Sequence, residues 1–317
     1  MSTNTIPVVN LQQFVSGNTE ERKKFVVQLG KAYHEVGFVA VENHGIPDSL
    51  IADFYKLVNE FFALPKETKS KYEIAGLAGQ RGYTSFGKEH AKHSNKGDLK
   101  EFWQFGQWVN DADTNKPEYP ENVKVEELPE FYATGKKLFK EFEKCGSELL
   151  KAIALFLNLD EHYFDDKIYN GNSILRAIHY PPIIEEPDGA IRSEQHEDIN
   201  LITLLVGASA EGLQLLNMQG EWKDITAGPG QIVVNVGDML QRLTNNYLKS
   251  TTHRVVNPPR EKWHEPRLSI PFFLHPRSEM RLDCIASCVT EDNPLQYEPI
   301  SAGEYLDERL VQIGLKK

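Results

Sequence analysis

Two histidines and one aspartate have the side chains and the spacing expected of a catalytic metal site. His196 and Asp198 are separated only by Glu197, and His253 follows much later in the chain. Two neutral imidazoles and one carboxylate that leave coordination positions open form the facial triad of non-haem Fe(II) oxygenases. Zinc sites usually close a tetrahedron, or use three histidines, or two histidines with a glutamate. We therefore expect His196, Asp198 and His253 to bind Fe(II).

Strands are the elements predicted to bring these three side chains together. The run Ile199–Leu205 after Asp198 is rich in leucine and β-branched residues, which favours a strand. Alternate side chains of a strand point to the same face, so His196 and Asp198 would project into one cavity. His253 begins a second strand-like run, so the third ligand is expected from another strand.

A guanidinium and a hydroxyl form a second pair with the same spacing. Arg267 and Ser269 open a segment that continues Ile-Pro-Phe-Phe, so both would lie on one face of a strand. The planar fork of an arginine beside a hydroxyl can bind a carboxylate through two hydrogen bonds. A structural salt bridge is the alternative for such a pair taken alone. Together with the triad, and in this order, the pair favours an anion site.

Longer segments resemble the Fe(II)- and 2-oxoglutarate-dependent oxygenases of the isopenicillin N synthase-like branch. The resemblance covers nearly the whole chain and is carried by residues 6–11, 36–47, 61–69, 180–182, 211–214, 234–238 and 243–255. It implies a double-stranded β-helix (jelly-roll) core wrapped by N-terminal helices. It also implies Fe(II) as cofactor and 2-oxoglutarate as cosubstrate, with Tyr180 joining Arg267 and Ser269 at the distal carboxylate.

The reaction implied by the resemblance is the oxidation of a small molecule by O2. Such enzymes decarboxylate 2-oxoglutarate to succinate and carbon dioxide while they hydroxylate, desaturate or cyclise their substrate. Isopenicillin N synthase also has the Arg-x-Ser pair but uses no 2-oxoglutarate, and Glu197 and residues 243–247 resemble that enzyme itself. A cyclase that acts on a peptide or amino acid therefore stays open. A non-catalytic barrel that binds a metal or a carboxylate is disfavoured by the complete triad.

Residues that would contact the substrate are harder to predict. In the resembling family the segment around Arg81 and Tyr83 reaches over the mouth of the active site, so these two are our candidates. A solvated arginine and a packed tyrosine are the alternative. Residues 73–98 as a whole are expected to form an irregular loop, and the spacing of Gly76, Gly79 and Gly82 is not that of a nucleotide-binding motif.

The pattern of hydrophobic residues predicts a mainly β fold with flanking helices. From Ser173 onward, short apolar runs alternate with turns that contain glycine or proline, which is typical of a sandwich or jelly roll. Before that point the spacing is helical: Asn18 and Glu21 form a potential capping box, and residues 128–157 predict a long amphipathic helix.

Composition adds limits on domains and partners. The chain has 317 residues, 40% of them hydrophobic, and shows no linker or repeat, so we expect one domain over residues 1–317. Within it, we expect an N-terminal region, residues 1–130, to pack on a core formed by residues 170–280. The net charge of -11 disfavours nucleic acid as a partner, and no apolar run reaches membrane-span length. Three widely spaced cysteines and an N-terminus unlike a signal peptide predict a cytoplasmic protein.

Overall fold

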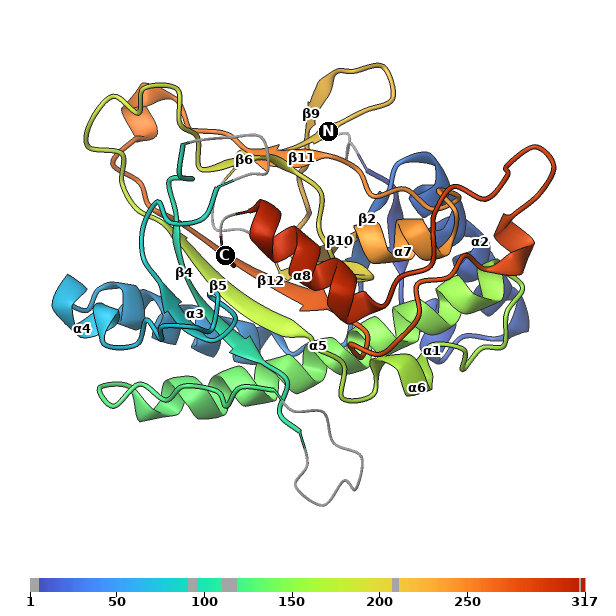
Figure 1. Cartoon of the computed structure of the whole chain (residues 1–317), viewed down its shortest axis with the longest axis horizontal. Helices are drawn as coiled ribbons and strands as arrows, with labels where there is room; N and C mark the ends of the chain where they lie inside the picture. The colour runs from blue at the N-terminus through green and yellow to red at the C-terminus, as the bar shows by residue number, and fades with distance from the viewer. Residues whose placement is uncertain (1–5, 91–95, 110–118, 207–210, 314, 317) are drawn as a thin grey trace.

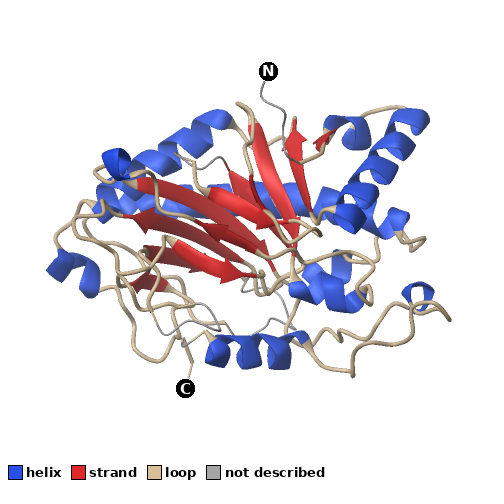
Figure 2. Ribbon diagram, turned by 90° about the horizontal axis from the view of Figure 1, so that it is seen from above, coloured by secondary structure: helices blue, strands red, loops and turns tan. Residues whose placement is uncertain are grey.

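Two β-sheets of unequal size form the centre of the molecule, and helices surround them (Figures 1 and 2). The computed structural model of the protein describes residues 6–90, 96–109, 119–206, 211–313 and 315–316. The fold is mainly β with flanking helices, as predicted. The strands are β1 (Val8–Asn10), β2 (Phe38–Glu42), β3 (Gly82–Thr84), β4 (Glu101–Gly106), β5 (Ile174–Tyr180), β6 (Ser193–His196), β7 (Ile202–Val206), β8 (Leu213–Leu216), β9 (Trp222–Asp224), β10 (Gln231–Val236), β11 (His253–Val255) and β12 (Arg267–Leu274).

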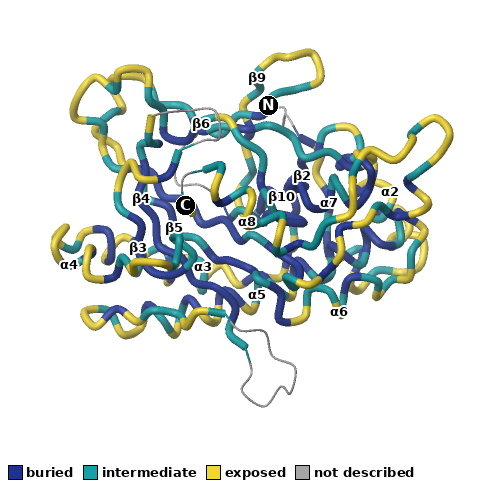
Figure 3. The backbone as a smooth tube through the Cα atoms, in the orientation of Figure 1, coloured by how far each residue is buried: buried dark blue, intermediate teal, exposed yellow. Residues whose placement is uncertain are grey.

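The larger sheet has eight strands in the order β1-β2-β10-β7-β12-β5-β4-β3, and the smaller sheet has four in the order β6-β11-β8-β9. The N-terminal strands β1 and β2 extend one edge of the large sheet, and β3 and β4 extend the opposite edge. The N-terminal region therefore completes the sheet as well as covering it. Figure 3 shows that the central strands are the most deeply buried part of the backbone.

The helices are α1 (Gln12–Val15), α2 (Thr19–Glu35), α3 (Asp48–Phe62), α4 (Lys66–Ser70), α5 (Pro129–Phe156), α6 (Asp165–Ile168), α7 (Asp238–Leu243) and α8 (Ala302–Gln312), with short 3-10 turns at Arg260–Lys262 and Ala286–Cys288. Helices α2 and α5 begin and end close to the predicted positions. The capping box of α2 is confirmed: the Asn18 side chain accepts from the backbone N–H of Glu21, and the Glu21 carboxylate accepts from that of Asn18. Among the residues that the structure describes, no helix is long and apolar enough to cross a membrane.

Helix α5 supports the large sheet from the side away from the cavity. It packs on α2, α3, β7 and β12, and the ring of Phe142 stacks on that of Phe272 in β12 at a centroid distance of 5.2 Å. Gly146 allows this close approach, because a Cβ atom there would lie 2.3 Å from Cδ1 of Leu274. Since alternate side chains of a strand point to opposite faces, the burial of Phe272 against α5 turns Phe273 toward the cavity.

The segment 73–98 contains a strand, so the prediction of an irregular loop throughout is wrong. Strand β3 pairs with β4 and places Tyr83 opposite Trp103. Three residues are too few to show the alternation that reveals a strand in a sequence. The Tyr83 hydroxyl donates to Glu101, whose carboxylate also lies 2.8 and 2.9 Å from Nζ of Lys69. This buried ion pair joins α4 to β4.

Helix α8 crosses the open side of the large sheet near the C-terminus, drawn in red in Figure 1. The Ser301 hydroxyl accepts from the backbone N–H of Glu304, which begins the helix with a second capping box. The guanidinium of Arg309 and the hydroxyl of Tyr305 both donate to the buried carboxylate of Asp238. Leu306 and Leu310 of the same helix line the cavity described below.

Candidate active site

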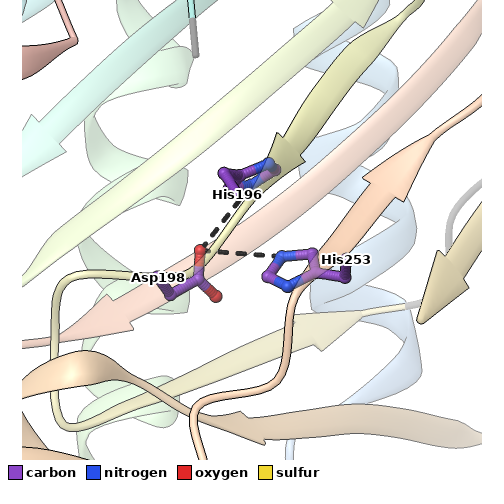
Figure 4. A group of neighbouring side chains, drawn as sticks. All are labelled: His196, Asp198 and His253. Carbon is purple, nitrogen blue, oxygen red and sulfur yellow. Dashed lines mark ion pairs between the residues drawn. The ribbon is translucent and has the colours of Figure 1, made fainter. Parts of the chain in front are cut away.

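The structure brings His196, Asp198 and His253 together, as Figure 4 shows. Each residue offers one ligand atom, and these atoms all lie within 4.8 Å of one another. Oδ1 of Asp198 is 4.0 Å from Nε2 of His196 and 3.8 Å from Nε2 of His253. All three residues line one cavity of about 210 Å³ between the two sheets. The arrangement is that of a metal centre with one open side.

The two histidines come from paired strands, whereas the aspartate comes from a loop. His196 ends β6 and His253 begins β11, and the antiparallel register sets them directly opposite each other, with ring centroids 4.4 Å apart. Asp198 lies beyond the end of β6, so the expectation that it shares a strand face with His196 is wrong. Its carboxylate is held instead by Thr203 and Asn235, whose Oγ1 and Nδ2 donate to Oδ2 at 2.6 and 2.8 Å.

Hydrogen bonds to backbone carbonyls set the tautomer of both histidines. Nδ1 of His196 is 2.6 Å from the carbonyl oxygen of Glu194, and Nδ1 of His253 is 3.0 Å from that of Thr251. A carbonyl oxygen only accepts, so each Nδ1 carries the proton and each Nε2 keeps a lone pair directed toward Asp198. Oδ2 of Asp198 accepts from its two donors, so Oδ1 is the oxygen that faces the two Nε2 atoms.

The charge states suit a divalent cation. Burial tends to raise the pKa of Asp198, but the two imidazoles and the hydrogen bonds from Asn235 and Thr203 outweigh it and lower the pKa. Burial lowers the pKa of His196, and the neighbouring His253 lowers it further. A metal ion needs its ligands deprotonated, and the lowered pKa values of His196 and Asp198 favour a neutral imidazole and a carboxylate. The donor set therefore fits Fe(II) with positions left for exchangeable ligands.

Arg267, Ser269 and Tyr180 form a separate polar group in the same cavity. Arg267 and Ser269 lie on one face of β12, as predicted, and Tyr180 of β5 is directly opposite Arg267 in the register. Cζ of Arg267 is 4.9 Å from the centroid of the Tyr180 ring, and all three residues are buried. A buried guanidinium beside two hydroxyl groups is chemically suited to a carboxylate.

The cavity wall between these groups follows the alternation of β5 and β12. Every second residue of each strand faces inward: Ile174, Arg176, Ile178 and Tyr180 from β5, and Arg267, Ser269, Pro271 and Phe273 from β12. Ile174, Ile178, Pro271 and Phe273 make half of this wall apolar, so it offers a surface for an organic molecule next to the metal ligands.

The structure does not place Arg81 and Tyr83 at this cavity. The guanidinium of Arg81 donates to the backbone carbonyls of Pro120 and Gln80, at 3.1 and 2.7 Å. Tyr83 faces α3, where its ring lies 6.0 Å from that of Phe61, and its hydroxyl meets Glu101. The pairing of β3 with β4 turns both side chains away from the metal ligands, so neither is positioned to contact a molecule bound there.

Sequence reasoning overlooked the side chains that support the site. Thr203 and Asn235 each interrupt an otherwise apolar strand, in Ile-Thr-Leu and Val-Asn-Val, and Arg176 does so in Leu-Arg-Ala. A polar residue at an inward position of a buried strand is rare unless it has a partner. This interruption is the signal in the sequence that could have identified them.

Comparison with known proteins gives the site its context. Residues 171–276 match the 2OG-Fe(II) oxygenase superfamily, and residues 6–127 match the N-terminal region of non-haem dioxygenases in morphine synthesis. Kihadalactone A synthase of Citrus sinensis is 32% identical, over 98% of this chain and 94% of its own length. A solved 2OG-Fe(II) oxygenase family protein from Caulobacter crescentus is 39% identical, with a TM-score of 0.87 over 98% of this chain and 100% of its own.

The chain belongs to the 2OG-Fe(II) oxygenase superfamily. A Neurospora crassa protein that has been solved with alpha-KG and thymine is 29% identical, with a TM-score of 0.85 over 96% of each chain. This oxygenase is therefore a non-haem Fe(II) dioxygenase with a jelly-roll core that uses 2-oxoglutarate as cosubstrate. The comparisons favour this activity over the 2-oxoglutarate-independent cyclase considered from the sequence.

Proposed function

We propose that His196, Asp198 and His253 hold the Fe(II), and that Arg267, Ser269 and Tyr180 hold the distal carboxylate of 2-oxoglutarate. One observation carries this assignment: both groups line the same buried cavity, and one end has metal-ligand chemistry while the other has carboxylate-binding chemistry. The positions of Tyr180 on β5 and of Arg267 and Ser269 on β12 follow from the strand register, so backbone pairing sets how they lie relative to one another.

Each residue has a defined task in this assignment. Bound Fe(II) would supply O2 activation coupled to the decarboxylation of 2-oxoglutarate to succinate and carbon dioxide. Thr203 and Asn235 orient the Asp198 carboxylate, and the carbonyls of Glu194 and Thr251 orient the two imidazoles. Arg267 neutralises the distal carboxylate, and the packing of α8 over the cavity limits the access of water to the oxidation.

The substrate is proposed to be a small organic molecule, oxidised by O2 through hydroxylation, desaturation or ring closure. The cavity volume of about 210 Å³ and its apolar wall support this class. The Neurospora crassa relative, which has been solved with thymine and with 5-formyluracil, is a guide to the size of such a molecule. We also propose a single domain, since both edges of the large sheet are N-terminal strands, and a cytoplasmic location, where a reducing environment keeps iron ferrous.

An anaerobic titration tests the residue assignment. Fe(II) and then 2-oxoglutarate are added to the purified protein, and the weak visible charge-transfer band of a chelated 2-oxo acid is recorded. We expect the band in the wild type, no band in His253→Ala, and a band only at higher 2-oxoglutarate concentration in Arg267→Gln. A band of normal strength in His253→Ala would contradict the triad, and iron binding without any band would mean that Arg267 and Ser269 hold another carboxylate.

A further inference from the structure

A cluster of four charged side chains, Glu89, Asp98, Lys100 and Arg176, lines the cavity and has no task in the reaction described above. Nζ of Lys100 lies 2.7 Å from Oε1 of Glu89 and 2.8 Å from Oδ2 of Asp98, and Nη1 of Arg176 lies 3.2 Å from the same Oε1. Glu89, Asp98 and Lys100 are all buried. Two acids and two bases balance, so the cluster as a whole carries no net charge and calls for no counter-ion.

The cluster lies beside β6, the strand that ends at His196, because Asp98 accepts from the backbone N–H of Glu194 and Lys100 donates to the Ser193 hydroxyl. Thr203, which donates to Asp198, pairs with Phe273, and Phe273 pairs with Ile174 on β5, two residues before Arg176. Strands β7, β12 and β5 are consecutive in the large sheet (Figure 1). Two strand spacings correspond to about 10 Å. A flat molecule lying over Phe273 would therefore reach Glu89 and Arg176 with one edge and the metal with the other.

Glu89 keeps one oxygen without a donor. Its Oε1 accepts from both Lys100 and Arg176, whereas its buried Oε2 has no hydrogen-bond partner among the described residues. Burial tends to raise the pKa of Glu89, but Arg176 and Lys100 outweigh it and lower the pKa to about 2, so the group is a carboxylate at neutral pH. A buried carboxylate oxygen without a donor is unfavourable. A donor on a bound molecule would satisfy it.

Arg176 presents a donor beside this acceptor. Its Nε donates to Oε1 of Gln104 at 2.7 Å and its Nη1 donates to Glu89, and a guanidinium has five N–H donors in all. Its Cζ lies 4.1 Å from the ring centroid of Phe102 and 5.2 Å from that of Phe273, so two aromatic rings fix the plane of the guanidinium. The cavity thus offers one acceptor and one donor side by side next to the ring of Phe273.

We propose that Glu89 and Arg176 select the substrate by its lactam edge, which is an N–H group next to a carbonyl group on a flat, neutral ring. The N–H donates to Oε2 of Glu89, and the carbonyl accepts from the guanidinium of Arg176. Because the cluster carries no net charge, neither an anionic nor a cationic substrate would find an unpaired counter-ion there. This inference rests on the proposed function, because it places the lactam ring between this pair and the iron.

Calorimetry with matched probes tests the inference without requiring catalysis. Thymine, 2-pyridone and 2-quinolone are each compared with their fully N-methylated counterparts, on the protein with Mn(II) and 2-oxoglutarate. We expect the N–H form of at least one probe to bind about 10- to 100-fold more tightly, since a hydrogen bond to a charged group is lost on methylation. In Glu89→Gln this selectivity ratio should fall about tenfold, and Arg176→Gln should weaken both members of the pair.

Glu73→Gln is the matched control, because Glu73 also pairs with a lysine, Lys88, and does not line the cavity. A purely structural role of Glu89 would weaken both members of a probe pair equally and leave the ratio unchanged, and that result overturns the inference. So does a ratio of one for all three probes in the wild type. The charge-transfer band of the wild type with Fe(II) and 2-oxoglutarate is recorded in parallel. Absence of this band would refute the proposed function. The ratio of the affinities for the N–H and N-methyl probes would still decide the role of Glu89.

Discussion

His253 lies directly opposite His196 in the antiparallel pairing of β11 with β6, and this register places their imidazole centroids 4.4 Å apart. Two residues far apart in the sequence thus become neighbours through backbone hydrogen bonds alone. Because Nδ1 of each ring is bonded to a carbonyl, the register also directs both Nε2 lone pairs toward Asp198. Metal affinity should therefore depend on residues that never touch the metal.

The first prediction concerns the support of Asp198. Thr203→Val removes the hydroxyl that donates to Oδ2, at 2.6 Å, and leaves the carboxylate less firmly oriented. We expect Fe(II) affinity to fall about 10- to 100-fold, which is the usual effect of losing such a partner. Anaerobic calorimetry measures it. Thr203→Ser keeps the hydroxyl and should stay close to the wild type; an equal loss in both variants would show that packing of the methyl group matters instead.

The second prediction concerns the arginine proposed to hold 2-oxoglutarate. Arg267→Gln removes the charge, and we expect the KM for 2-oxoglutarate to rise about 10- to 100-fold, since a charge-assisted hydrogen bond is lost. Arg267→Lys keeps the charge but not the planar fork, so its KM should lie between the two. Succinate formation at varied 2-oxoglutarate gives the values. Arg281→Gln, an exposed residue paired with Asp283, is the control and should change nothing.

The third prediction concerns metal binding and thermal stability. A ligand that binds only the folded state at 100 times its Kd stabilises that state by about 2.7 kcal/mol. Saturating Mn(II), which avoids oxidation during heating, should therefore raise the Tm by several degrees, and a chelator should reverse the shift. His196→Ala should show no metal-dependent shift. A shift of the same size in this variant would mean that the ion binds elsewhere.

The fourth prediction concerns the buried pair of Glu101 and Lys69. Glu101→Gln leaves the Lys69 ammonium without its partner, and we expect a loss of about 3 kcal/mol in the free energy of unfolding, measured in urea. Lys71→Gln is the control, because Lys71 is exposed and its Nζ lies 4.0 Å from Oε1 of Glu127. Removing this exposed ion pair should change the free energy of unfolding only slightly.

The effect of Glu101→Gln on the free energy of unfolding should depend on pH, and the direction of this dependence follows from the pKa of Glu101. Burial tends to raise the pKa of Glu101, but hydrogen bonds from His179, Lys69 and Tyr83 outweigh it and lower the pKa. The ionised Glu101 carboxylate stabilises the fold fully at pH values above its pKa in the unfolded chain, which is about 4.3. This stabilisation is lost as the pH falls through its lower pKa in the folded protein. The difference in free energy of unfolding between wild type and Glu101→Gln should therefore become smaller below about pH 4. If this difference stays constant, the ionised carboxylate of Glu101 is not its cause.

Local patterns in the sequence were sufficient wherever a residue's neighbours along the chain determine its structure. The capping box of Asn18 and Glu21 and the long helix α5 depend on periodic contacts a few residues apart, and both were predicted closely. The same holds for Arg267 and Ser269, because two residues with this spacing share a face on any strand. The residue types of the triad indicated their metal chemistry directly.

Contacts between distant segments were decided by the tertiary structure. Spacing suggested that Asp198 shares a strand with His196, but the chain leaves β6 first, and Thr203 and Asn235 position the carboxylate from two other strands. The spacing of residues also did not predict that β3 joins the edge of the large sheet. Nor did it predict that the Arg81 side chain is directed toward Pro120 and away from the cavity. The composition of a segment limits its local geometry, whereas strand order and register follow from which apolar faces bury one another. Only the folded chain therefore shows that Glu89 and Arg176 meet beside the metal site.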